Sequence, residues 1–155
     1  MKIKCIAVDD EPLALRLLTK FIKQTSFLDL IGEFSNGIEA LGFVNQNEVQ
    51  LVFMDIQMPD LSGMELARIL DGKKNSDRTR IIFCTAYHQF AIEGYKVEAL
   101  DYLLKPYSYE DFLAAATKAY QYFEKVKQNL EVQPRKESEV QPEYIFLKVE
   151  YQLVK

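Results

Sequence analysis

Five polar residues stand directly after short apolar runs of the kind that form buried β-strands: Asp9, Asp10, Asp55, Thr85 and Lys105. In an open α/β sheet the ligand crevice lies outside the carboxyl ends of the strands, so these side chains are expected to converge on one edge. Three carboxylates in one place repel each other unless a cation neutralises them. A cluster of hard oxygen ligands suits Mg²⁺, which completes its shell with water and phosphate oxygens.

The same side chains suit phosphoryl transfer, which needs an in-line nucleophile, a bridging metal and a cation for the equatorial oxygens. Asp55 stands alone at the centre of the group, so we expect it to be the nucleophile, while Asp9 and Asp10 hold the metal. Lys105 supplies a point charge for one phosphoryl oxygen, and Thr85 supplies a hydrogen bond for another. The structural alternative is that Asp10 caps a helix, Asp55 starts a turn and Lys105 is solvated.

Short apolar runs alternate with longer segments of helical periodicity. The predicted strands are 3–8, 28–34, 51–54, 80–84 and 100–104. The predicted helices are 12–24, 37–46, 64–70, 89–95 and 109–128, the last with Ser108 as its N-cap. Strict alternation of strand and helix implies parallel strands that are joined by right-handed crossovers. We therefore predict an α/β fold: a doubly wound five-stranded parallel sheet of order 2-1-3-4-5 with helices on both faces.

The composition of the 155 residues, 48% hydrophobic and 27% charged, is typical of a globular protein. A formal net charge of −4 gives no basic field, so the bulk of the chain is not expected to bind nucleic acid. No apolar run reaches the roughly 20 residues that cross a bilayer, so no membrane association is expected. Cys5 and Cys84 lie inside apolar runs and are expected to be buried and unpaired, which favours a cytoplasmic setting.

The pattern changes after residue 128. Residues 129–143 are polar, charged and interrupted by two prolines, so they are predicted to form an exposed linker. Residues 144–155 then alternate aromatic, aliphatic and charged side chains in the manner of a β-strand. This run is too short to be a domain, so it either packs on the first domain or begins a second one.

Four sequence features occur in an order that resembles the receiver domains of two-component response regulators. They are the pair Asp9-Asp10, the segment MDIQMPDLSGME around Asp55, the strand-end pair Thr85-Ala86 and the segment DYLLKP around Lys105. The resemblance spans about residues 1–126 and implies a flavodoxin-like, CheY-like fold.

In such a domain Asp55 would be the phosphoacceptor, and Lys105 would pair with the phosphoryl oxygens. The resemblance implies that Mg²⁺ is bound, directly or through water, by Asp9, Asp10, Asp55 and the backbone carbonyl of Gln57. Pro106 matches a proline that follows a cis peptide bond. A receiver phosphorylated on its own aspartate is not an enzyme that turns over an external substrate.

The resemblance also implies partners and a switch. A sensor histidine kinase would donate the phosphoryl group. Thr85 would move toward that group and vacate space into which Tyr102 rotates. The face built from residues 89–95, 100–104 and 109–128 would then form a homodimer.

Residues 85–108 and 144–155 resemble regulators that join a receiver to a LytTR-type DNA-binding domain. The implied organisation is a receiver domain over 1–128, a linker over 129–143 and the start of a truncated DNA-binding domain over 144–155. The whole protein would control transcription and would contact DNA only through the missing C-terminal domain.

Two other classes of protein fit part of the pattern. A stand-alone receiver acts by protein–protein contact alone. A small phosphatase also uses an aspartate nucleophile with Mg²⁺, but such enzymes usually carry a second carboxylate two residues later. That residue is Gln57 here.

Overall fold

The structure is a computed structural model, and it describes residues 1–71, 79–86 and 98–136. Within this part the elements are β1 (Ile3–Val8), α1 (Pro12–Lys23), β2 (Leu28–Phe34), α2 (Gly37–Gln46), β3 (Leu51–Met54), α3 (Gly63–Asp71), β4 (Arg80–Thr85), β5 (Asp101–Leu104) and α5 (Tyr109–Lys136). The chain divides into two compact units, Met1–Tyr120 and Gln121–Lys155. The first unit contains the whole sheet.

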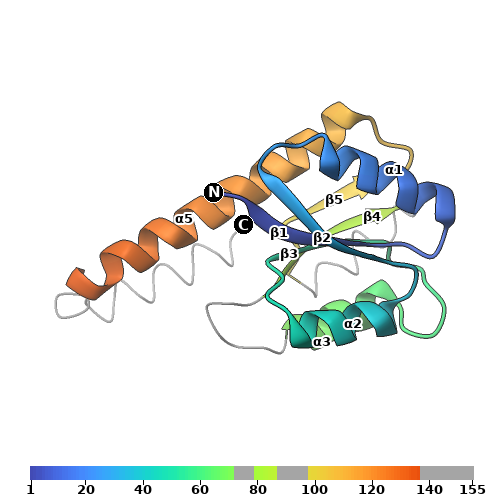
Figure 1. Cartoon of the computed structure of the whole chain (residues 1–155), viewed down its shortest axis with the longest axis horizontal. Coiled ribbons are helices and arrows are strands. Elements are labelled where there is room, and N and C mark those ends of the chain that lie inside the picture. Colours follow the sequence, from blue (N-terminus) through green and yellow to red (C-terminus); the bar gives the residue numbers. More distant parts are fainter. Residues whose placement is uncertain (72–78, 87–97, 137–155) are drawn as a thin grey trace. The chain divides into compact units, whose positions relative to one another are not determined.

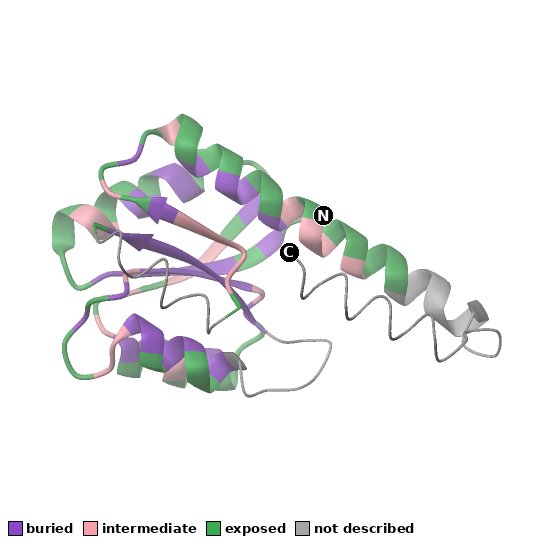
Figure 2. Cartoon of the chain, turned by 180° about the vertical axis from the view of Figure 1, so that it is seen from behind, coloured by how far each residue is buried: buried purple, intermediate pink, exposed green. Residues whose placement is uncertain are grey.

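The sheet consists of five parallel strands in the order β2-β1-β3-β4-β5, as predicted. The apolar strands β3 and β4 are buried along their whole length, as expected for strands that are covered on both faces (Figure 2). Figure 1 shows α1 and the beginning of α5 on one face of the sheet, and α2 and α3 on the other. The fold is therefore the predicted doubly wound α/β sandwich.

Aromatic side chains join α1 and α5 to the sheet on one face. The ring of Phe112 in α5 stacks on Phe53 of β3 with 5.1 Å between centroids, and it lies 5.7 Å from the ring of Phe21 in α1. The hydroxyl of Tyr109 donates a hydrogen bond to the carbonyl of Gln24 over 3.2 Å. These contacts fix the beginning of α5, and with it the end of the loop that follows β5.

Four of the described helices begin next to residues whose side chains accept a hydrogen bond from the backbone three residues further on. For α1, α2, α3 and α5 these residues are Glu11, Asn36, Ser62 and Ser108, with distances of 2.8 to 3.1 Å. The prediction for Ser108 is confirmed. The cap of α1 is Glu11, so Asp10 is not the residue that caps this helix.

Helix α5 is longer than predicted. It continues to Lys136, past the predicted end at residue 128, because residues 129–133 include leucine, glutamate and glutamine, which favour helix. The helix therefore enters the segment predicted to be a linker, while the boundaries of the three predicted segments stay predictions. The predicted helix 89–95 and the run 144–155 lie outside the described residues.

Both cysteines are buried and free, as predicted. Among the residues that the structure describes, no helix is both long enough and apolar enough to span a membrane.

Candidate functional site

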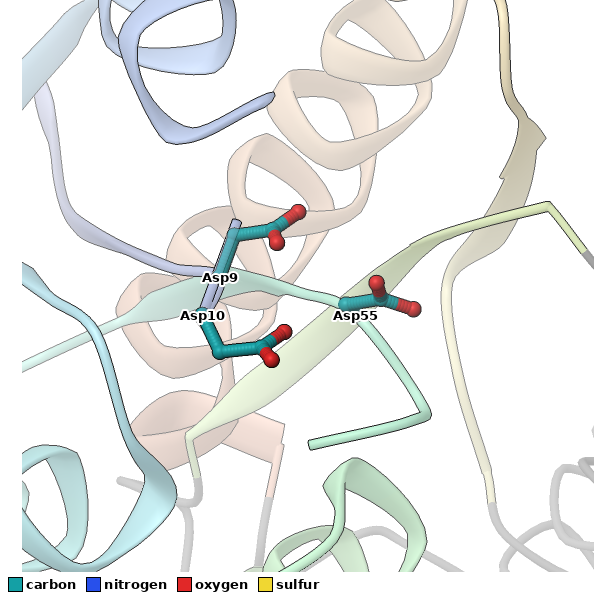
Figure 3. Close-up of side chains that lie close together, drawn as sticks. All are labelled: Asp9, Asp10 and Asp55. Carbon is teal, nitrogen blue, oxygen red and sulfur yellow. The ribbon is translucent and has the colours of Figure 1, made fainter. Parts of the chain in front are cut away.

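The carboxyl ends of β1 and β3 bring three carboxylates together. Val8 and Met54 are paired across these neighbouring strands, so the residues that follow them emerge side by side. One carboxylate oxygen from each of Asp9, Asp10 and Asp55 lies within 4.8 Å of the other two. Figure 3 shows that the three side chains point the same way, out from the strand ends. The predicted acidic cluster is present.

Asp9 is the buried member of this cluster, with 1% of its surface exposed. Its Oδ1 accepts a hydrogen bond from the backbone N–H of Glu11 over 3.0 Å, and its Oδ2 accepts one from Lys105 Nζ over 2.7 Å. Burial raises the pKa of Asp9, and these two partners offset the rise only in part. The ionised form of Asp9 is therefore held at a net energetic disadvantage.

Lys105 joins the two strand ends that carry carboxylates. Its Nζ donates to Asp9 Oδ2 and also to Asp55 Oδ2, the second over 3.0 Å. Burial alone would lower the pKa of Lys105, but the hydrogen bonds and charges of the two carboxylates outweigh it and the pKa is raised. The ammonium is therefore a firmly charged group between two carboxylates and not a solvated loop residue.

The backbone around Lys105 is held by the neighbouring strand. The Lys105 N–H donates to the carbonyl of Thr85 over 2.8 Å, which continues the pairing of β4 with β5. The peptide bond between Lys105 and Pro106 is cis, as the resemblance implied. Thr85 is buried at the end of β4, next to the strand that carries the lysine.

Tyr102 occupies a different place from the charged residues. Its ring stacks on Phe83 of β4 with 5.4 Å between centroids, and it packs against the core between the sheet and α2 and α3. Its hydroxyl is buried and has no hydrogen-bond partner among the residues that the structure describes. The structure thus brings together Asp9, Asp10, Asp55 and Lys105, and places Tyr102 in the adjoining core.

Residues 5–117 match the response regulator receiver domain family. The chain belongs to this family. Its receiver region is 42% identical over 104 residues to the transcriptional regulatory protein BtsR of Escherichia coli K12, an alignment that covers 67% of this chain and 42% of BtsR. An uncharacterized response regulatory protein of Shewanella oneidensis is 44% identical over 104 residues, which cover 67% of this chain and 43% of that protein.

Solved receiver structures have the same fold. The response regulatory domain of MrkE from Klebsiella pneumoniae has a TM-score of 0.74 and 33% identity, covering 79% of this chain and 99% of that one. The chemotaxis regulator CheY4 of Vibrio cholerae, at 21% identity, has a TM-score of 0.68 over 77% of this chain and 99% of that one. The alignment spans less than half the length of BtsR and covers the receiver region alone.

The acidic cluster of this receiver domain fits Mg²⁺. Carboxylate oxygens are hard ligands, and three of them lie within 4.8 Å of one another beside the single positive charge of Lys105, which leaves the cluster with a net negative charge when all three are ionised. Asp9, Asp10 and Asp55 would hold the ion with the backbone carbonyl of Gln57, whose N–H donates to Asp55 Oδ1 over 3.3 Å. A bound cation would offset this net negative charge and stabilise the negative charge of a phosphoryl group.

Two residues at this site have roles that the sequence reasoning missed. Glu11 both caps α1 and, through its N–H, orients the carboxylate of Asp9. Its position two residues after Asp9 and directly before Pro12 was the available signal, because proline is common in the first turn of a helix. Gly63 begins α3, and a Cβ there would lie 2.1 Å from the carbonyl oxygen of Asp55, so only glycine allows this approach.

Proposed function

We propose that the protein is a phosphorylation-activated response regulator that accepts a phosphoryl group from a sensor histidine kinase on Asp55. The observation that carries the proposal is the position of Lys105 Nζ, 3.0 Å from Asp55 Oδ2 and 2.7 Å from Asp9 Oδ2, within a cluster of three carboxylates. The residues proposed as the nucleophile, as the cation for the phosphoryl oxygens and as the metal ligands therefore lie at one edge of the sheet, which supports this function.

In the proposed transfer an oxygen of Asp55 attacks phosphorus as the P–N bond of the donor phosphohistidine breaks. The electron pair of that bond returns to the imidazole nitrogen, and the product on Asp55 is an acyl phosphate. Mg²⁺, when bound, would neutralise negative charge on the oxygens of the phosphoryl group during its transfer. Two of the three N–H donors of Lys105 reach Asp9 and Asp55, so the third is available to pair with a phosphoryl oxygen.

The output is proposed to follow from a two-state change. Thr85 moves toward the phosphoryl group, and Tyr102 rotates into the space that it leaves. Leu104 on β5 and Leu113 on α5 are large apolar side chains, 38% and 36% exposed, and they support the proposed homodimer face. The third part of that face, residues 89–95, lies outside the described residues.

We propose transcription as the regulated process, through a LytTR-type DNA-binding domain that would follow the linker. The support is the name of the relative BtsR, a transcriptional regulatory protein, together with the β-like pattern of residues 144–155. The second candidate is a stand-alone receiver that acts by protein–protein contact. A longer gene product that continues past Lys155 would favour the first.

The test is the intact mass of the protein after incubation with acetyl phosphate and Mg²⁺, with Asp55→Asn as the matched control. A labile phosphoryl adduct on the wild type alone is the expected result. No adduct on a correctly folded wild type would refute the role of Asp55. Steady hydrolysis of a phosphate ester by the same sample would favour a phosphatase instead.

A further inference from the structure

Gly37, the first residue of α2, lies against Leu61 in the loop that joins β3 to α3. A Cβ on Gly37 would lie 2.6 Å from the carbonyl oxygen of Leu61 and 3.3 Å from its Cβ. Gly37 does not have a positive φ, so another residue could adopt its backbone conformation. What glycine provides at this position is space for the approach of α2 to the Leu61 carbonyl.

The loop that Gly37 contacts is short and closed. The N–H of Gly63 donates to the carbonyl of Ile56 over 2.8 Å, and the N–H of Leu61 donates to that of Pro59 over 2.8 Å. At its other side the loop meets a second close approach, because a Cβ on Gly63 would lie 2.1 Å from the carbonyl oxygen of Asp55. The loop therefore has little room to absorb a displacement of Leu61 without moving its first residues.

We propose that Gly37 is a positioning residue for the metal and phosphoryl site. The beginning of α2 is a fixed support for the β3–α3 loop, and it thereby sets the position of the Gln57 carbonyl and of Asp55. This inference rests on the proposed function of Asp55 and of the acidic cluster. Helix α2 carries none of the reacting groups. According to this inference, its first residue nevertheless helps to position the metal ligands.

Substitution of Gly37 by alanine brings two physical effects into opposition. Alanine is a better helix former than glycine, so helix propensity alone predicts a more stable α2 and no change at the metal site. The contact with Leu61 predicts instead that the loop is displaced, because a Cβ does not come within 2.6 Å of a backbone carbonyl oxygen. Gly42, in the same helix, is the matched control, because a Cβ there would meet nothing within 4 Å.

The experiment titrates Mg²⁺ alone into the full 155-residue chain by isothermal titration calorimetry, for the wild type, Gly37→Ala and Gly42→Ala. We expect Gly37→Ala to weaken the Kd for Mg²⁺ by about tenfold, as changes behind the ligands of a metal typically do. Gly42→Ala should keep the wild-type Kd. In the metal-free protein the backbone amide signals of Gln57 and Leu61 should move in Gly37→Ala and stay in place in Gly42→Ala.

An unchanged Kd in Gly37→Ala would overturn the inference, and so would equal weakening in both variants, since that would trace the effect to helix stability. If Gly37→Ala is unfolded, the same Mg²⁺ titration is made with the double variant Gly37→Ala/Gly42→Ala, in which the second alanine stabilises α2. Failure of the proposed function has a different signature. In that case the wild type itself would show neither Mg²⁺ binding nor an Asp55-dependent phosphoryl adduct.

Discussion

Replacement of Asp9 by asparagine is expected to stabilise the metal-free protein while it weakens metal binding. Asp9 is the buried carboxylate of the cluster, and burial raises its pKa despite the contact with Lys105. Asparagine keeps a side-chain oxygen for the N–H of Glu11 and removes the buried charge. Lys105 Nζ keeps its contact with Asp55 Oδ2 at 3.0 Å, so its positive charge is still paired with a carboxylate.

The size of the effect follows from the charges. At 4.8 Å, the upper limit of the oxygen separations in the cluster, two carboxylates repel by about 3 kcal/mol at an effective dielectric constant of about 20. Lys105 offsets this repulsion, and the burial of Asp9 remains as the larger effect. We expect Asp9→Asn to raise the free energy of unfolding by about 1 to 2 kcal/mol. The corresponding rise in Tm is about 3 to 6 °C.

The pH dependence gives a second measure of the same effect. Because the pKa of Asp9 is higher in the folded state, the folded state binds this proton more tightly than the unfolded state. The stability of the metal-free wild type should therefore fall as the pH rises from about 4, the ordinary carboxyl range, through the raised pKa of Asp9. Asp9→Asn should lack that component.

The assay is urea unfolding followed by circular dichroism in the presence of a chelator, repeated across the pH range. Asp10→Asn is the control, because Asp10 is exposed and its substitution removes cluster charge without removing a buried charge. If Asp9→Asn is less stable than the wild type at neutral pH without metal, the pair with Lys105 outweighs burial and the reasoning is refuted. In a separate measurement, addition of Mg²⁺ is expected to raise the free energy of unfolding of the wild type more than that of Asp9→Asn or Asp10→Asn.

Three further changes test local features of the structure. Asp60 has a φ of 69°, so Asp60→Gly should be tolerated while Asp60→Val lowers the unfolding free energy by about 1 to 2 kcal/mol; equal Tm values for the two variants would contradict this. Tyr102→Phe removes a buried hydroxyl that has no partner in the described part of the chain. It should leave urea stability unchanged or raise it by about 1 kcal/mol, whereas a loss would show that the hydroxyl is hydrogen-bonded. Ser108→Ala removes the cap of α5 and should lower stability by about 1 kcal/mol, measured against Ser108→Asp, which can cap as well as serine.

The strand order of the sheet could be predicted from the sequence because the way parallel strands are connected restricts it. Parallel strands need crossovers, so the alternation of apolar runs and helical segments leaves few possible orders. The convergence of Asp9, Asp10 and Asp55 follows from that order, since the ends of neighbouring strands meet at one edge. No distance was needed to predict this part of the site.

Other features depend on distances that the sequence does not contain. Gly37 and Gly42 are both glycines of one predicted helix, and nothing local distinguishes them, yet only Gly37 lies against a backbone carbonyl. The bridging position of Lys105 was open for the same reason, because a lysine after a strand is as often solvated. The end of α5 depends on the helix propensity of a polar segment. Two prolines in that segment made its secondary structure difficult to predict.

The charges of the site indicate why Thr85 is needed in the proposed cycle. Three carboxylates and one ammonium carry two net negative charges when all are ionised, and one Mg²⁺ ion balances them. Phosphorylation replaces the single charge of Asp55 by about two, so one negative charge and several acceptor oxygens are added without a matching cation. Lys105 already contacts two of the carboxylates, and Thr85 carries a hydroxyl donor at the end of β4, the strand that neighbours β3. The proposed movement of that hydroxyl toward Asp55 on phosphorylation would couple the chemistry at β3 to the packing around β4 and β5.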